Sequence, residues 1–112
     1  MDKANLIVIG GGAAGMSIAA AAKRAQPRWR IVVIEAGKHI SYAACGIPYF
    51  IDGRTPQLTD MIILTPKTAL EKKGIEALVL HRVKSIDTNT RKVTVLDIEN
   101  DRVFDITYDK LA

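Results

Sequence analysis

Three glycines between an apolar run and an alanine-rich run constrain the fold of this chain more than any other feature. Gly10, Gly12 and Gly15 form the spacing G-x-G-x-x-G. Residues 5–9 before them predict a buried strand, and residues 13–25 after them predict a helix. Gly10 allows a tight turn, Gly12 leaves room for a pyrophosphate, and Gly15 permits close packing of the helix. The arrangement is typical of βαβ units that bind adenine dinucleotides, so it predicts an α/β fold.

An acidic residue completes this pattern. The next apolar run, residues 31–34, ends in Glu35, which stands 20 positions after Gly15. An acid at this place accepts hydrogen bonds from the ribose hydroxyls of an adenosine, and its charge disfavours a 2′-phosphate. The pyrophosphate is expected at the N-terminus of the helix, where free N–H groups and the helix dipole attract anions. The alternative is a glycine-rich turn that binds no ligand.

The rest of the chain predicts further short helices and an antiparallel meander. A short helix is expected to start at Gly46, and a second helix is expected between the Thr65-Pro66 cap and Gly74. Residues 36–44 are expected to be irregular, and residues 54–66 are expected to form a polar loop that the apolar stretch 61–64 interrupts. Strands with alternating apolar and polar residues are predicted at 76–80, 82–87, 92–98 and 102–107. Residues 108–112 are predicted to lead into another strand.

Composition narrows the function classes. A chain of 112 residues makes one domain at most. The net charge of +4 comes from scattered basic residues, and no stacking motif of aromatic residues accompanies them, so nucleic-acid binding is not expected. The apolar residues 6–9 are too short for a membrane span. His39 and His81 with one cysteine give no metal-ligand spacing, and a single cysteine suits a reducing cytoplasm.

The sequence around that cysteine resembles a known family. The stretches GGGAAGMSIAAAAKRAQP and VIEAGKHISYAACGIPYFIDG, and the strands leading to YDKL, are similar to the flavoprotein disulfide reductase superfamily. Within it, the chain most resembles the single-cysteine branch of coenzyme A disulfide reductases, NADH oxidases and NADH peroxidases. The resemblance covers essentially all 112 residues. The segment SYAACGIPY, which contains Cys45, is its most specific part.

The resemblance implies a Rossmann-like, FAD-binding βαβ unit with an antiparallel β-meander at about residues 75–107, truncated before the last strand of the domain. Residues 1–112 are thus expected to be the N-terminal part of an FAD-binding domain. The nicotinamide-binding and dimerisation domains of the family are absent from this sequence. The parent protein is expected to be a homodimer. The fragment alone is expected to be inactive, and an exposed sheet edge could pair it into a strand-swapped oligomer.

The family's site residues can be carried over position by position. Cys45 is the implied catalytic residue. The residues implied to bind FAD are Gly10, Gly12, Ala13, Ala14 and Gly15 at the pyrophosphate, Glu35, Ala36 and Lys38 at the adenosine, Val83 at the adenine and Ser41 near the flavin ring. The candidates for a coenzyme A site are Ser17, Lys23 and Arg24.

The implied chemistry depends on one sulfur atom. Phe50 stands where two-cysteine reductases have their second cysteine, so Cys45 has two oxidised states open to it. A mixed disulfide with a small thiol indicates disulfide reduction, and a sulfenic acid indicates reduction of peroxide or oxygen. The resemblance therefore implies an NAD(P)H-dependent flavoprotein oxidoreductase that reduces a small disulfide similar to coenzyme A disulfide. The alternatives are an NADH oxidase or peroxidase, and a non-catalytic nucleotide-binding or assembly fragment.

Overall fold

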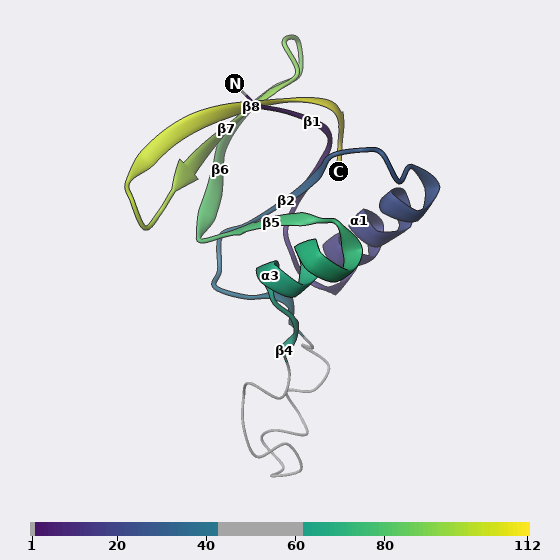
Figure 1. Ribbon diagram of the computed structural model, residues 1–112. Helices are drawn as coiled ribbons and strands as arrows, with labels where there is room; N and C mark the ends of the chain where they lie inside the picture. The colour runs from purple at the N-terminus through teal and green to yellow at the C-terminus, as the bar shows by residue number, and fades with distance from the viewer. Residues whose placement is uncertain (1, 43–61) are drawn as a thin grey trace.

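The computed structural model describes residues 2–42 and 62–112 of the chain (Figure 1). The elements in chain order are β1 (Asp2–Ile9), α1 (Ala13–Ala25), β2 (Ile31–Glu35), β3 (Ile40–Tyr42), β4 (Ile62–Leu64), α3 (Pro66–Thr68), the π-helical turn η3 (Ala69–Lys73), β5 (Glu76–Val79), β6 (His81–Asp87), β7 (Lys92–Asp97) and β8 (Arg102–Leu111). The predicted helix at Gly46 and the predicted catalytic Cys45 lie outside the described residues.

Six of the strands form one mixed sheet in the order β5-β2-β1-β8-β7-β6. The pairs from β5 to β8 are parallel, and the pairs among β8, β7 and β6 are antiparallel. The first four residues of β2 are all buried, as expected of a parallel strand that is covered on both faces. The predicted α/β fold with a meander is confirmed, and α1 and β2 have their predicted bounds.

The strand β8 belongs to both parts of the sheet. Its first half pairs antiparallel with β7, from Arg102 opposite Asp97 to Thr107 opposite Lys92. Its second half pairs parallel with β1, where Tyr108 lies opposite Ala4. The residues after 107 are therefore not an approach to another strand. They continue β8 and form the fourth parallel strand.

The sequence pattern assigns residues 76–80 to the meander, and this assignment is wrong. The strand β5 pairs parallel with β2, at the end of the sheet opposite β6. A helix lies between β2 and β5, and such a connection returns the chain in the same direction. An ion pair joins the two strands at their start, with Arg30 Nη2 at 3.0 Å from Glu76 Oε2. Alternation of side chains could not reveal which neighbour β5 pairs with.

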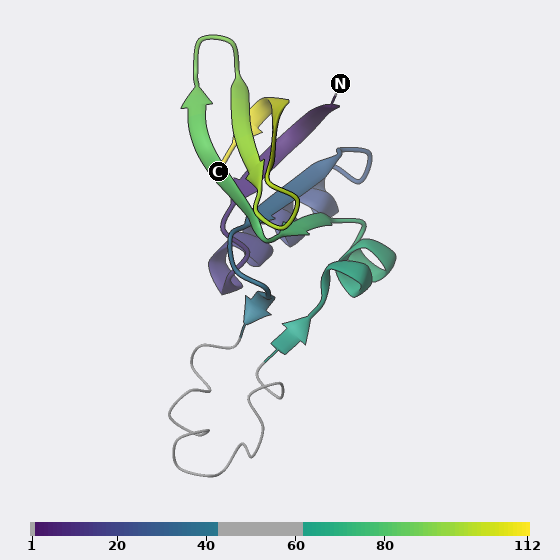
Figure 2. The same ribbon diagram turned by 90° about the vertical axis from the view of Figure 1, so that its left-hand side faces the viewer.

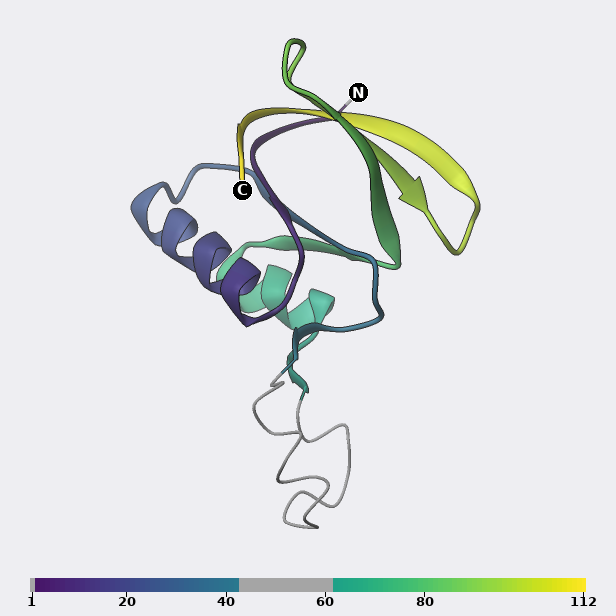
Figure 3. The same ribbon diagram turned by 180° about the vertical axis from the view of Figure 1, so that it is seen from behind.

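Two layers cover the parallel strands. Figures 1 and 3 show α1 and α3 on one face, and the meander strands on the other. The core on the helical side consists of Leu6, Val8, Met16, Ala19, Ile31, Val33, Ile40, Ala69 and Ile75. The core on the meander side consists of Ala4, Ile7, Val32, Ile34, Val93, Val95, Ile106 and Tyr108. Figure 2 shows the β6–β7 hairpin extending away from the helices.

A second sheet replaces part of the irregular structure expected in residues 36–44 and of the polar loop expected in residues 54–66. The strands β3 and β4 pair antiparallel, with Ile40 opposite Leu64 and Tyr42 opposite Ile62. Ile40 is fully buried in the core beneath α1. A three-residue strand is too short for alternation to be visible, so the pattern rule misses it.

The second predicted helix is present and has its predicted ends. Thr65 caps it through a capping box with Thr68, and Gly74 ends it in the left-handed conformation at φ 68°. Its last residues form the π-helical turn η3 in place of α-helix. Such turns recur at functional sites, and this one carries Lys72 and Lys73.

Three carboxylates make the stability of the fold sensitive to acid. Hydrogen bonds from the backbone N–H groups of Thr90 and Asn89 lower the pKa of Asp87, and the Asn100 side-chain amide lowers that of Asp97. The ammonium group of Lys3 lowers the pKa of Asp109.

Each carboxyl has a lower pKa in the folded chain than its ordinary value of 3.8, so each stabilises the fold above that pH. This contribution is lost as the pH falls through the folded pKa. We therefore expect the free energy of unfolding in urea to change little from pH 7 to 5 and to fall steeply below about pH 4. Replacing all three carboxyls by amides should flatten the acid limb, and an equally steep limb in that variant would contradict this account.

Candidate functional site

The turn from β1 into α1 depends on Gly10. Its φ is +100°, a conformation that side chains other than glycine rarely adopt. Its N–H donates to the carbonyl oxygen of Ile34 at 2.8 Å, so the turn is fixed to the end of β2. The tight turn expected at the first glycine of the motif is therefore present.

The remaining glycines meet very different surroundings. A Cβ atom on Gly15 would lie 1.9 Å from the carbonyl oxygen of Gly10, and a Cβ atom on Gly11 would lie 2.6 Å from Ile40 Cγ2. These two glycines allow close packing of backbone and side chains. A Cβ atom on Gly12 would meet nothing within 4 Å. Gly12 therefore borders open space in front of the helix.

That open space lies at the N-terminus of α1. Gly12 is the N-cap of the helix, no side chain caps it, and the first turn carries no acidic residue. The N–H groups of residues 13–15 have no partner inside the helix, because the first turn of any α-helix leaves its donors free. Gly12 and Ala14 are exposed. The donors and the positive end of the helix dipole suit a pyrophosphate, so the residues present fit a dinucleotide.

Glu35 joins the glycine turn to the loop after β2. Its Oε1 accepts a hydrogen bond from Gly11 N at 2.8 Å, and its Oε2 accepts one from Gly37 N at 2.7 Å. A carboxylate has about four acceptor positions, so two hydrogen bonds leave capacity for ribose hydroxyls. The acid is thus held in place before any ligand arrives.

A hollow of about 250 Å³ lies next to the turn. It is lined by Ile9, Gly10, Ile34, Glu35, Ala36, His81, Arg82 and Val83. The structure thereby brings together Glu35, Ala36 and Val83, which come from separate parts of the sequence. The lining of the hollow does not include Lys38, which is exposed in the loop, or Ser41, which lies in β3. Sequence reasoning missed His81 and Arg82, although both directly precede Val83.

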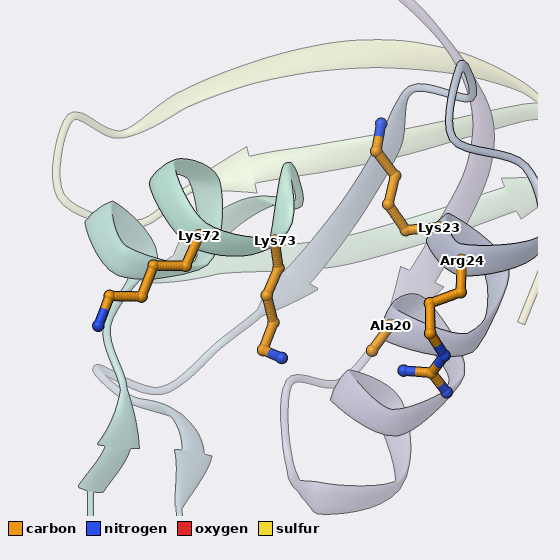
Figure 4. Close-up of a pocket in the computed structure, with 5 residues that line it drawn as sticks. All are labelled: Ala20, Lys23, Arg24, Lys72 and Lys73. Atoms are coloured by element: carbon orange, nitrogen blue, oxygen red, sulfur yellow. The ribbon is translucent and has the colours of Figure 1, made fainter.

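A second pocket, of similar volume, is basic. It lies between α1 and η3 and is lined by Ala20, Lys23, Arg24, Lys72 and Lys73. Figure 4 shows the side chains of Arg24 and Lys73 extending toward the gap beside Ala20. Lys23 points its ammonium group away from this gap, and Lys23 Nζ donates to the carbonyl oxygen of Trp29 at 2.7 Å.

The pocket changes the set of residues that could hold an anionic substrate. Of the sequence candidates, Arg24 faces the gap, Lys23 is bound to the backbone, and the exposed Ser17 is not among the lining residues. Lys72 and Lys73 escaped notice because cations at the end of a helix are ordinary partners of the helix dipole.

Two kinds of feature are absent from the part of the chain that the structure describes. Within 2–42 and 62–112, no three His, Cys, Asp or Glu side chains lie close enough to hold a metal ion. In the same part of the chain, no helix has both the length and the apolar composition that crossing a membrane requires.

The sequence of this chain is similar to that of a known protein family and of individual relatives. Residues 4–112 match the family described as "Pyridine nucleotide-disulphide oxidoreductase". An "NAD(P)H sulfur oxidoreductase (CoA-dependent)" of Pyrococcus abyssi is 37% identical over 103 residues, which are 92% of this chain and 23% of that protein. An "NADH oxidase" of Methanocaldococcus jannaschii is 33% identical over 106 residues, 95% of this chain and 23% of that protein.

A solved structure extends the likeness to three dimensions. The NAD-dependent persulfide reductase from A. fulgidus superposes with a TM-score of 0.89 at 30% identity, over 96% of this chain and 20% of that one. The chain thus spans less than a quarter of the length of these relatives. The family match covers nearly all of its residues, and the chain belongs to the pyridine nucleotide-disulphide oxidoreductase family.

Proposed function

We propose that this chain is the N-terminal FAD-binding portion of an NAD(P)H-dependent oxidoreductase that reduces a small disulfide through Cys45. The observation that carries the proposal is the continuity of the glycine turn with the hollow. Gly10 forms part of both, and Glu35 contacts the turn through Gly11 and lines the hollow. An adenosine in the hollow can therefore continue into a pyrophosphate at α1 without leaving the protein surface.

In this proposal, different residues bind different parts of the dinucleotide. The backbone N–H groups of residues 12–15 hold the pyrophosphate, and Glu35 accepts hydrogen bonds from the ribose hydroxyls. Ala36 and Val83 flank the adenine, with Lys38 at the adenosine rim. Ser41 is assigned to the flavin end. When bound, FAD supplies the capacity to accept a hydride from NAD(P)H and to pass two electrons to a sulfur atom.

The remaining parts of the reaction belong to a longer protein. The relatives are four to five times the length of this chain, since it covers 20 to 23% of them. We assign the nicotinamide-binding and dimerisation domains to that additional length, and the parent is a homodimer in this proposal. A reducing cytoplasm suits a redox site with a single thiol.

Coenzyme A disulfide is the substrate class that the basic pocket favours. The phosphates of coenzyme A are anions, and Arg24 and Lys73 offer cations from two different elements. Lys23 stabilises the loop at Trp29, and Ser17 is a polar neighbour on the same helix. The relative from Pyrococcus abyssi carries the words "CoA-dependent" in its name, which supports the same substrate class.

A second candidate function uses the same residues. An NADH oxidase or peroxidase would cycle Cys45 through a sulfenic acid in place of a mixed disulfide. The NADH oxidase of Methanocaldococcus jannaschii among the relatives favours this alternative. The two functions differ in the oxidant that modifies the sulfur, so trapping the modified cysteine separates them.

An FAD titration of the 112-residue chain, followed by flavin fluorescence, tests the proposal. We expect saturable quenching, and we expect Glu35→Ala to weaken binding by about tenfold or more, because charged hydrogen-bond acceptors contribute about 1.5 to 3 kcal/mol. Glu71→Ala, at an exposed position on η3, is the control and should bind like the wild type. No quenching at any FAD concentration would sink the proposal for this chain.

Two further measurements distinguish the non-catalytic readings. A chain that binds FAD but whose Cys45 forms no adduct with a disulfide or peroxide would be a nucleotide-binding module alone. A chain that scatters light as an oligomer and binds no nucleotide would be an assembly fragment, joined through a sheet edge.

A further inference from the structure

One buried acid has no role in the proposed function. Asp97, at the end of β7, is the buried charged residue of the part of the chain that the structure describes. It lies directly opposite His81 in the β6–β7 register, and His81 lines the nucleotide hollow. Burying a carboxylate costs free energy unless the carboxylate is paired and hydrogen-bonded, so the contacts of Asp97 indicate what it stabilises.

The imidazole of His81 is held on three sides. Its Nδ1 lies 2.6 Å from the carbonyl oxygen of Val79, and because a carbonyl only accepts, Nδ1 carries the proton. Its Nε2 faces Asp97 Oδ2 at 3.9 Å, which is too long for a hydrogen bond and forms an ion pair when the ring carries a proton on both nitrogens. The edge of the ring packs against Phe104, with centroids 5.9 Å apart and an interplanar angle of 76°. The side chain of His81 is only 18% exposed.

Asp97 is fixed as an anion. Its Oδ2 accepts a hydrogen bond from Asn100 Nδ2 at 2.8 Å, and its Oδ1 accepts one from Asn100 N at 3.3 Å. The Asn100 amide is the main cause of the lowered pKa of Asp97, burial opposes it, and His81 contributes a smaller attraction. At neutral pH a negative charge therefore faces the histidine that borders the hollow.

The backbone next to His81 is strained and bound on both sides. Leu80 connects β5 to β6 with a φ of 55°, which is unusual for a residue other than glycine. Leu80 N donates to the carbonyl oxygen of Gly37 at 3.0 Å, and Ile98 N donates to that of Leu80 at 2.9 Å. Such strain persists only where surrounding contacts over-determine the conformation. The contacts of His81, the next residue, help to hold Leu80 in this conformation.

We propose that His81 and Asp97 form a clamp that holds the β5–β6 turn in its nucleotide-binding conformation. The inference rests on the proposed function and adds a positioning residue to it. The clamp ties the turn to Val79 on one side and to the end of β7 on the other. Because His81, Arg82 and Val83 form one wall of the hollow, fixing the turn fixes the wall that meets the adenine.

Isothermal titration calorimetry of the 112-residue chain with ADP tests the clamp. His81→Leu removes the Nδ1–H donor and the ring that faces Asp97, and should lower the ADP affinity about three- to tenfold, the range expected for one lost hydrogen bond. His81→Asn places an amide N–H where Nδ1 was and should restore part of the affinity. His39→Leu changes the other, exposed histidine and should bind ADP like the wild type.

A double-mutant cycle and hydrogen exchange complete the test. Asp97→Asn should weaken ADP binding on its own and add little to His81→Leu, because both remove the same interaction. Amide exchange at Leu80 and Ile98 should accelerate in His81→Leu and in Asp97→Asn, while His39→Leu leaves it unchanged. If His81→Leu fails to fold, His81→Asn and Asp97→Asn still test whether the clamp holds the β5–β6 turn.

The outcomes separate the two proposals. Unchanged ADP affinity in folded His81→Leu, beside a wild type that binds, overturns the clamp and leaves the proposed function standing. A wild type that does not bind ADP overturns the proposed function, and the exchange rates of Leu80 and Ile98 then decide whether the clamp exists. Equal loss of affinity in His81→Leu and His81→Asn, without faster exchange, also overturns it.

Discussion

Alanine at Gly15 is expected to destabilise the chain by about 3 kcal/mol or more, or to prevent folding, because overpacking of this severity exceeds the usual 1–3 kcal/mol range. The new Cβ atom would lie 1.9 Å from the carbonyl oxygen of Gly10 and 3.4 Å from Val8 Cγ1. The carbonyl belongs to a turn whose N–H is bonded to the carbonyl oxygen of Ile34, so it cannot move without disturbing that hydrogen bond.

The sign of this effect distinguishes packing from helix propensity. Gly15 lies in the first turn of α1, where propensity alone would make alanine more stable by up to about 1 kcal/mol. The steric term has the opposite sign and is several times larger. Urea denaturation followed by circular dichroism measures the difference, and a Gly15→Ala chain as stable as the wild type would show that the close approach to Gly10 is not required.

Gly12→Ala is the matched control, since it makes the same chemical change three positions earlier. Its Cβ atom meets nothing within 4 Å and its φ of −72° suits any residue, so the change should cost no more than about 1 kcal/mol, the usual cost of alanine at an N-cap. The methyl group would stand where the pyrophosphate is proposed to lie, so ADP affinity should fall although the fold is intact. Unchanged affinity would mean that the ligand does not approach α1 at Gly12.

The parts of the fold that follow local rules were open to prediction from the sequence. The alanine-rich run of α1 and the continuous apolar run of β2 identify these two elements, and the Thr65-Pro66 and Gly74 signals fix the ends of the second helix. Pairing partners were not accessible in the same way. The parallel pairing of β5 with β2 depends on tertiary contacts that alternation does not encode, and β3 and β4 are stabilised by burial of Ile40.

The same distinction between local rules and tertiary contacts applies to the residues of the candidate site. Gly10, Gly15 and Glu35 could be identified because the motif prescribes their spacing, and the structure gives Gly10 and Gly15 the backbone roles expected of them. The wall at His81 and the cations at Lys72 and Lys73 come from other elements. Their place beside the hollow and beside α1 depends on the sheet order and on the π-helical turn, neither of which a motif specifies.

Serine at Cys45 is expected to abolish adduct formation with coenzyme A disulfide, and to abolish disulfide-dependent turnover in a full-length protein. In the proposed step, the Cys45 thiolate attacks one sulfur of the disulfide, a new S–S bond forms to one coenzyme A half, and the other half leaves as a thiolate. A serine hydroxyl cannot form this bond. Mass spectrometry of the intact 112-residue chain, before and after treatment with a reductant, measures the adduct.

Two comparisons make this experiment decide between the functions. Arg24→Ala with Lys73→Ala should slow adduct formation with coenzyme A disulfide by about fivefold and leave the reaction with uncharged hydroxyethyl disulfide unchanged, because exposed charge pairs contribute about 0.2 to 1 kcal/mol each. If the double substitution changes the rates with the two disulfides equally, the basic pocket does not recognise coenzyme A, and coenzyme A is removed from the proposal. A sulfenic acid trapped after peroxide treatment, without any disulfide adduct, would favour the oxidase or peroxidase function, because the same sulfur would then accept oxygen in preference to a thiol.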